Sequence, residues 1–167
     1  GRFAEQILPE QVHILNVSFL VPTLRREYGG CAGNIAYTLQ ALGGAPVVMA
    51  TLGNDGGDYL ARLAGWGVDT TLVRSDAGTY TAQAIIITDT DNNQITAFHP
   101  GAMMRSYENH VKDVPGVTIG IVSPDGYEGM LQNAKEFAEA GIPFIFDPGQ
   151  AMPLFNGAEL RAFIEQA

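Results

Sequence analysis

Strand-like and helix-like segments alternate along most of this 167-residue chain, and this alternation limits its fold more than any other feature. Residues 46–52 (PVVMATL) and 117–123 (VTIGIVS) are apolar runs typical of strands that are covered on both faces. Residues 56–65 and 127–140 carry apolar side chains at helical spacing. Strands that alternate with helices predict right-handed crossovers, and therefore an α/β fold with a doubly wound, mainly parallel sheet. Further helices are predicted at 34–42, near 106–113 and from 157, and further strands near 70–74 and at 143–147.

The spacing of apolar residues also predicts which helix faces are buried. In helix 34–42, Ile35, Leu39 and Leu42 share one side. In helix 127–140 the residues on one side are Met130, Leu131, Ala134 and Phe137. We expect both sides to face the core.

Two segments depart from the alternation. Residues 11–20 alternate in the manner of a half-buried strand, and residues 80–98 read as a β-hairpin that turns at 91–93. We expect strands near 11–28 and 80–99 to form a small separate β-sheet beside the main one. The apolar residues of the hairpin predict a homodimer surface, because an isolated two-stranded sheet is marginal and needs cover.

Charge and cysteine content exclude several classes of protein. The net charge is −9 and Lys112 and Lys135 are the only lysines, so binding to nucleic acid or to an anionic membrane is disfavoured. No stretch approaches the length of an apolar membrane span, and we read no signal peptide. Cys31 is the only cysteine, which excludes an intrachain disulfide and fits a cytoplasmic protein. The chain begins without Met and its final helix has no stop signal, so both ends look truncated.

A glycine-rich segment ahead of helix 34–42 is the strongest functional motif. It contains Gly29, Gly30 and Asn34. Glycines let the backbone approach a ligand closely, and the free N–H groups of a first helical turn can donate to hydroxyl or anionic oxygens. It is not a phosphate-binding P-loop, because no Gly-Lys-Ser/Thr follows, and its glycine spacing does not fit a dinucleotide fingerprint. A tight turn with Asn34 as the helix cap is the alternative interpretation.

The spacing of this motif resembles the N-terminal signature of the PfkB/ribokinase family of carbohydrate kinases. The matching positions are Gly29, Gly30, Ala32, Asn34 and Ala36, followed by Gly43 and Gly53. Residues 51–57 resemble the family's strand-to-helix turn, and residues 67–69 resemble its helix exit. The stretches 14–22, 92–101 and 146–150 look most like its bacterial adenosine-kinase-like branch.

The resemblance implies a ribokinase-like fold, with the 11–28 and 80–99 strands as a lid, and an ATP-dependent kinase as the parent protein. Such kinases transfer the γ-phosphoryl group of ATP to a primary hydroxyl, with an aspartate as base and Mg²⁺ to stabilise charge. By the same resemblance Gly29, Gly30 and Asn34 grip ribose hydroxyls. Residues implied to line the pocket or flank a base are Cys31, Ala82, Phe98 and Tyr127.

The family's second signature, which ends in Gly-Ala-Gly-Asp and supplies the anion hole and the catalytic aspartate, is absent. We assign no element of this chain to Mg²⁺, and the first strand with its sugar-binding aspartate is expected before Gly1. We read Asp147 to Gln150 as a strand-end turn. The chain therefore holds an acceptor-binding half site, and we predict that it is catalytically inactive by itself.

Other polar residues carry weaker signals. His13, His99 and His110 are too scattered for a metal site, although His99 could face a pocket from the end of the hairpin. Asp89 and Asp91 have the positions of solvated turn residues. Asp125 follows a strand at its carboxyl end, the side where α/β sheets bind ligands.

Several functions stay open at this level. Adenosine is the favoured acceptor, because Phe98 and Tyr127 offer aromatic faces for a base. A ribose or fructose kinase is the alternative within the enzyme class. A non-catalytic nucleoside- or sugar-binding module and a structural α/β module, with glycines used only for packing, are the alternatives outside it.

Overall fold

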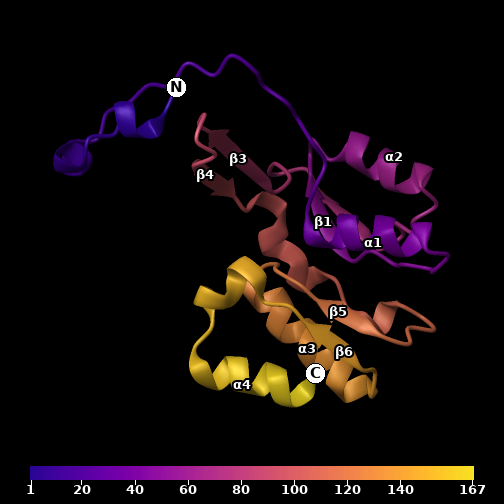
Figure 1. Cartoon of the computed structure of the whole chain (residues 1–167). Coiled ribbons are helices and arrows are strands. Elements are labelled where there is room, and N and C mark those ends of the chain that lie inside the picture. Colours follow the sequence, from indigo (N-terminus) through magenta and orange to yellow (C-terminus); the bar gives the residue numbers. More distant parts are fainter. The chain divides into compact units, whose positions relative to one another are not determined.

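The structure is a computed structural model that describes all 167 residues. The chain divides into two compact units, which are described separately (Figure 1). The smaller unit contains Gly1–Glu27 and Gln83–His99, and the larger one contains Tyr28–Ala82 and Pro100–Ala167.

The first half of the larger unit is built as the alternation predicts. Helix α1 (Cys31–Ala41) is followed by β1 (Ala50–Gly53), α2 (Gly57–Gly65) and β2 (Val73–Asp76). Strands β1 and β2 pair in parallel, with Ala50 opposite Val73 and Gly53 opposite Asp76. Ala36, Val48, Leu63 and Val68 form the buried core between these elements.

The second half of the larger unit repeats the arrangement. Strand β5 (Gly120–Val122), helix α3 (Tyr127–Ala140) and strand β6 (Phe144–Phe146) form a second parallel pair with its crossover helix. Helix α4 (Gly157–Gln166) follows, and Asn156 caps it by accepting hydrogen bonds from Ala158 and Glu159. The 3₁₀ segments of this half are η3 (Gly101–Glu108), η4 (Val111–Asp113) and η5 (Gly149–Leu154).

An aromatic-rich core holds this second half together. Met130 is fully buried on α3, and Phe137, Phe144, Phe155 and Phe163 are buried around it. The ring of Phe146 stacks on Phe163 with centroids 4.2 Å apart. The predicted inner face of α3 is confirmed, since Met130, Ala134 and Phe137 are buried there.

The predicted inner face of α1 is wrong. Leu39 and Leu42 are exposed, and the residues buried along this helix are Gly33 and Ala36. A Cβ on Gly33 would collide with the Tyr59 side chain of α2, and Ala36 is buried in the cluster with Val48, Leu63 and Val68. The polar helix expected near 106–113 is also different, because it forms the 3₁₀ segments η3 and η4.

The smaller unit contains the predicted hairpin. Strands β3 (Gln83–Thr88) and β4 (Gln94–His99) pair antiparallel, and Ala84 lies opposite Phe98. The turn is held by Asp89, which accepts hydrogen bonds from the backbone N–H groups of Asp91 and Asn93. Asp89 also accepts from the N–H of Phe3, so it joins the N-terminal segment to the hairpin tip.

The strand expected in 11–28 is wrong. This part of the chain contains the 3₁₀ helix η2 (Pro9–Ile14), after η1 (Phe3–Glu5), and no strand follows before α1. Alternation alone does not make a strand, because a strand needs a partner for its N–H and C=O groups. Leu20 and Leu24 are 93% and 92% exposed, so little burial holds this segment in a regular form.

The α/β class is confirmed by the two parallel pairs with their helices. In the structure these pairs are separate two-stranded sheets and not one continuous sheet. No helix combines the length and the apolar character that crossing a membrane requires.

Candidate functional site

The glycine segment forms the start of helix α1. Gly30 is the N-cap and has φ of +87°, a conformation that side chains rarely allow. No side chain caps this helix end. The N–H groups of its first turn are therefore available to a ligand.

Asn34 lies within the first turns of α1 and does not cap the helix. Its N–H donates to the carbonyl oxygen of Gly30 at 3.1 Å, and its own carbonyl accepts from the Thr38 hydroxyl at 2.9 Å. Its side chain is exposed, and its amide makes no hydrogen bond within the chain. This geometry rejects the cap interpretation and leaves an amide that can both donate and accept.

Helix α2 fastens the glycine segment from one side. The hydroxyl of Tyr59 donates to the carbonyl oxygen of Gly29 at 2.6 Å, and its ring packs on Tyr28 with centroids 4.9 Å apart. The guanidinium of Arg62 lies over the rings of Tyr28 and Trp66. Burial raises the pKa of Tyr59, an effect that the nearby Arg62 charge partly offsets.

A second cluster of hydrogen bonds lies at the carboxyl end of β1. The N–H of Gly53 donates to the Thr81 hydroxyl at 2.9 Å, and the N–H of Thr81 donates to Asp55 at 2.7 Å. This cluster holds Thr81 at the end of β1, and Ala82 is the next residue of the chain. The carboxyl ends of parallel strands are where α/β sheets bind ligands.

The remaining predicted residues lie in different surroundings. Cys31 is exposed in the first turn of α1. Phe98 is 56% exposed on β4 and belongs to the smaller unit. Tyr127 begins α3, where its ring stacks on Phe155 at 5.2 Å and its hydroxyl donates to Glu159.

Asp125 is the most perturbed carboxyl of the larger unit. It follows β5, and its carboxylate accepts a hydrogen bond from the N–H of Gly126 at 2.8 Å. Burial raises its pKa to about 6, and the hydrogen bond from Gly126 and the nearby Ser106 hydroxyl lower it in part. A carboxyl with this pKa can exchange a proton near neutral pH.

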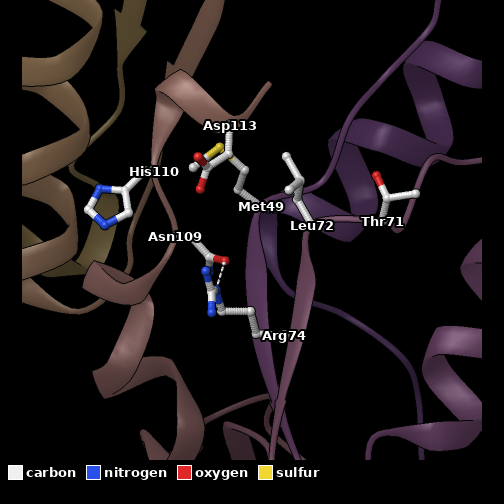
Figure 2. A pocket seen from close by; sticks show the side chains of 7 residues that line it. All are labelled: Met49, Thr71, Leu72, Arg74, Asn109, His110 and Asp113. Atoms are coloured by element: carbon white, nitrogen blue, oxygen red, sulfur yellow. Dashed lines mark hydrogen bonds between the residues drawn. The ribbon is translucent and has the colours of Figure 1, made fainter. Parts of the chain in front are cut away.

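A cavity of about 220 Å³ opens at the other end of β1 and β2 (Figure 2). Met49 and Leu72 lie just before these strands, and Arg74 donates to the Asn109 side chain at 3.0 Å. His110 also lines the cavity, and its ring pairs with Glu136 at 2.7 Å. None of the residues predicted to bind the substrate lines this cavity, so we do not assign the substrate site to it.

Metal ligation finds no support in the structure. No three His, Cys, Asp or Glu side chains come together in a way that could hold a metal ion. We therefore assign no residue of this chain to Mg²⁺.

Two residues of this region were not found from the sequence. Tyr59 and Thr81 contact Gly29 and Gly53, which lie 30 and 28 positions away along the chain. A tyrosine on an amphipathic helix and a threonine before a strand carry no pattern that predicts such contacts.

Comparison with known proteins gives a consistent result. The sequence pattern of the pfkB family of carbohydrate kinases matches residues 6–152. A nucleoside kinase of Methanocaldococcus jannaschii is 31% identical over 152 residues, which are 90% of this chain and 50% of that protein.

Solved structures agree with the sequence comparison. A nucleoside kinase of Burkholderia thailandensis in complex with inosine is 56% identical, with a TM-score of 0.88, and the match covers 100% of this chain and 53% of that one. The same kinase in complex with ADP-inosine is 59% identical, with a TM-score of 0.82 and coverage of 100% and 53%. The nucleoside kinase of M. jannaschii, an archaeal member of the ribokinase family, has a TM-score of 0.80 at 30% identity, with coverage of 92% and 51%. The chain thus spans about half the length of the relatives that it matches.

Proposed function

The chain belongs to the pfkB family of carbohydrate kinases and has the ribokinase-like fold of its solved relatives, and we propose that it forms the acceptor-binding half of a nucleoside kinase. One observation carries this proposal. The chain matches over its whole length a kinase in complex with inosine, and it contains a glycine segment with unpaired donors at a helix start.

We assign the ribose of the nucleoside to this glycine segment. The N–H groups of Gly29 and Gly30 can donate to hydroxyl oxygens, and the uncharged amide of Asn34 can both donate and accept. Cys31 is next to them in the first turn. Ala82, Phe98 and Tyr127 are the residues proposed to flank the base. Tyr127 already stacks on Phe155, so it needs a free edge or a rotation to meet a base.

The phosphoryl donor of the proposed kinase is ATP, assisted by Mg²⁺. This chain lacks a Gly-Ala-Gly-Asp stretch and a cluster of metal-ligating side chains. We therefore assign no residue of this chain to ATP or to Mg²⁺. The 167-residue chain by itself is expected to bind an acceptor and to transfer no phosphoryl group.

The test uses the full-length protein that contains this chain. ADP release from ATP is measured with adenosine, inosine, ribose and fructose as acceptors. We expect the two nucleosides to give a kcat/KM at least tenfold above the sugars, and adenosine is the favoured substrate. A higher kcat/KM for ribose or fructose would contradict the nucleoside assignment, and no ADP release with any acceptor would contradict a kinase.

We further propose that the hairpin of the smaller unit mediates a homodimer. Its register places Ile85, Ile87, Ile95 and Ala97 on one face. Ile85 is 60% exposed and Ile95 is 39% exposed. Ile85→Glu is expected to turn a dimer into a monomer in light-scattering chromatography, whereas Gln94→Glu on the opposite face leaves it unchanged. A wild-type monomer would contradict this proposal.

A further inference from the structure

The contact between Tyr59 and Gly29 is the most specific interaction that the glycine segment makes. Its oxygen–oxygen distance is 2.6 Å, and it joins the first turn of α2 to the residue before the N-cap of α1. The same face of α2 holds Tyr28 by ring packing and by the Arg62 guanidinium, 5.1 Å from the ring centroid. The segment is thus held by a hydrogen bond and by an aromatic contact.

Gly33 is the residue that makes this contact geometrically possible. It is buried on α1, and a Cβ at this position would collide with the hydroxyl oxygen of Tyr59 and lie 3.0 Å from its ring carbon Cζ. A side chain at position 33 would therefore push the phenol away from Gly29. Nothing else in the surroundings of Gly33 comes as near.

The hydrogen bond has a consequence for the next N–H group. The peptide between Gly29 and Gly30 is trans and planar, so its N–H points opposite to its C=O. Because Tyr59 holds the Gly29 carbonyl, the Gly30 N–H is directed away from α2. This N–H has no acceptor within the chain.

We propose that Tyr59 is a positioning residue, which aims the Gly30 N–H at the acceptor substrate by holding the Gly29 carbonyl. Glycine at position 33 is required because it admits the phenol. The inference rests on the proposed function, since it takes the nucleoside ribose as the ligand of this N–H. Tyr59 itself does not touch the substrate.

The chemistry of Tyr59 suits this role. Gly30 has φ of +87° and no side chain, so its peptide could rotate if nothing held it. Burial raises the pKa of Tyr59, which keeps the hydroxyl protonated and able to donate throughout the neutral range. The donor function therefore persists at any pH at which the kinase would work.

Tyr59→Phe in the full-length protein is the direct test. It removes one oxygen and keeps the ring that packs on Tyr28. We expect the KM for the nucleoside to rise about three- to tenfold, the worth of one hydrogen bond, with the KM for ATP unchanged. Tyr37→Phe is the matched control, because Tyr37 lies on α1 against Trp66 and its hydroxyl makes no hydrogen bond.

Nuclear magnetic resonance gives a readout that a merely structural role would not move. In the wild type the amide proton of Gly30 should shift when nucleoside is added, and in Tyr59→Phe this shift should shrink while the melting temperature stays the same. An unchanged nucleoside KM and an unchanged Gly30 shift in Tyr59→Phe would overturn the proposal. Equal increases in both KM values with a lower melting temperature would also overturn it.

A double-mutant cycle tests the part played by Gly33. Gly33→Ala as a single substitution should raise the nucleoside KM. The increase should be smaller when Tyr59→Phe is also present, because the added methyl group then no longer meets the Tyr59 hydroxyl oxygen. Independent effects in the cycle would overturn the link between the two residues. If the wild type binds no nucleoside, the proposed function is wrong. If the wild type binds nucleoside and Tyr59→Phe leaves its KM unchanged, only the positioning role of Tyr59 is wrong.

Discussion

Gly53 and Tyr80 pack backbone against backbone at the carboxyl end of β1. A Cβ on Gly53 would overlap with the carbonyl carbon of Tyr80 and would lie 2.6 Å from the carbonyl oxygen of Thr79. The N–H of Asn54 donates to that same Thr79 oxygen at 2.9 Å. The glycine is thus needed for the close approach of the two segments, which also brings Thr81 to the N–H of Gly53.

Gly53→Ala should destabilise the protein. The methyl group meets main-chain atoms that cannot rotate away, so the strand end must shift, at a cost of about 1–3 kcal/mol or more. Thermal unfolding of the full-length protein measures the effect. Gly65→Ala is the control, since a Cβ there meets nothing within 4 Å, and alanine is the better residue in a helix. A Gly53→Ala protein as stable as Gly65→Ala would contradict the close packing.

Gly53 illustrates which features of the fold can be predicted from the sequence and which cannot. The spacing of Gly53 from Gly30 and Gly43 marks it as part of a family signature, but its packing partner Tyr80 could not be predicted. A pattern in the chain reports local conformation and burial. It does not report which backbone segment passes above a glycine, because that depends on how the elements pack.

Asn34→Ala should weaken acceptor binding without harming the fold. Its exposed amide makes no hydrogen bond within the chain, so its removal leaves no buried group unpaired. If it binds the ribose, the KM for the nucleoside rises about three- to tenfold in the full-length protein. The melting temperature should stay within about 2 °C, as expected for a surface change.

Thr38→Ala is the control for Asn34→Ala, because Thr38 is exposed one turn further along α1 and its hydroxyl bonds only to the backbone. Equal nucleoside KM values in both variants would show that Asn34 does not hold the substrate.

The buried helix faces illustrate what decides a correct prediction. On α3 the large side chains of Met130 and Phe137 occur at helical spacing and fill the core, so the pattern predicts the face. On α1 the pattern favoured Leu39, whereas the buried residues are Gly33, which faces the Tyr59 side chain, and Ala36, which packs in the core cluster. Small residues give no hydrophobic signal, and the prediction therefore chose the wrong face.

Asp89 should titrate far below its ordinary range. Its pKa is lowered to about 2, first by the hydrogen bond from the N–H of Phe3, and also by the side chain and N–H of Asn93 and by the N–H of Asp91. A lowered pKa means that this carboxylate stabilises the fold above the unfolded value of 3.8, and that the stabilisation is lost as pH falls from about 4 towards 2.

Amide proton shifts of Phe3 and Asn93 follow this titration directly. We expect both to change with a midpoint near pH 2, and a midpoint near 4 would contradict the network. Asp89→Asn should show no such titration and should expose the N-terminal segment to proteases even at pH 7. The carboxylate accepts from Phe3 through one oxygen and from Asp91 and Asn93 through the other, whereas asparagine has a single acceptor oxygen. Asp58→Asn, exposed on α2, serves as the control.

Asp125 should affect the pH dependence of stability in the opposite direction to Asp89. Burial raises its pKa to about 6, so the folded protein binds the proton more tightly than the unfolded chain, whose value is 3.8. Between about pH 4 and 6 the folded state therefore holds more protons, and its stability falls as pH rises through this window. Above pH 6 the full cost of the buried charge is present, on the order of 2–3 kcal/mol.

Asp125→Asn should remove this cost and keep the geometry. Its side-chain oxygen can still accept from the N–H of Gly126, as the carboxylate does at 2.8 Å. We expect the variant to have a higher free energy of unfolding than the wild type at pH 7.5 and the same free energy of unfolding at pH 4. Chemical denaturation at both pH values measures the difference. A wild type that is equally stable at pH 4 and 7.5, or a variant that is less stable at pH 7.5, would mean that the charged form is satisfied by contacts that outweigh its burial.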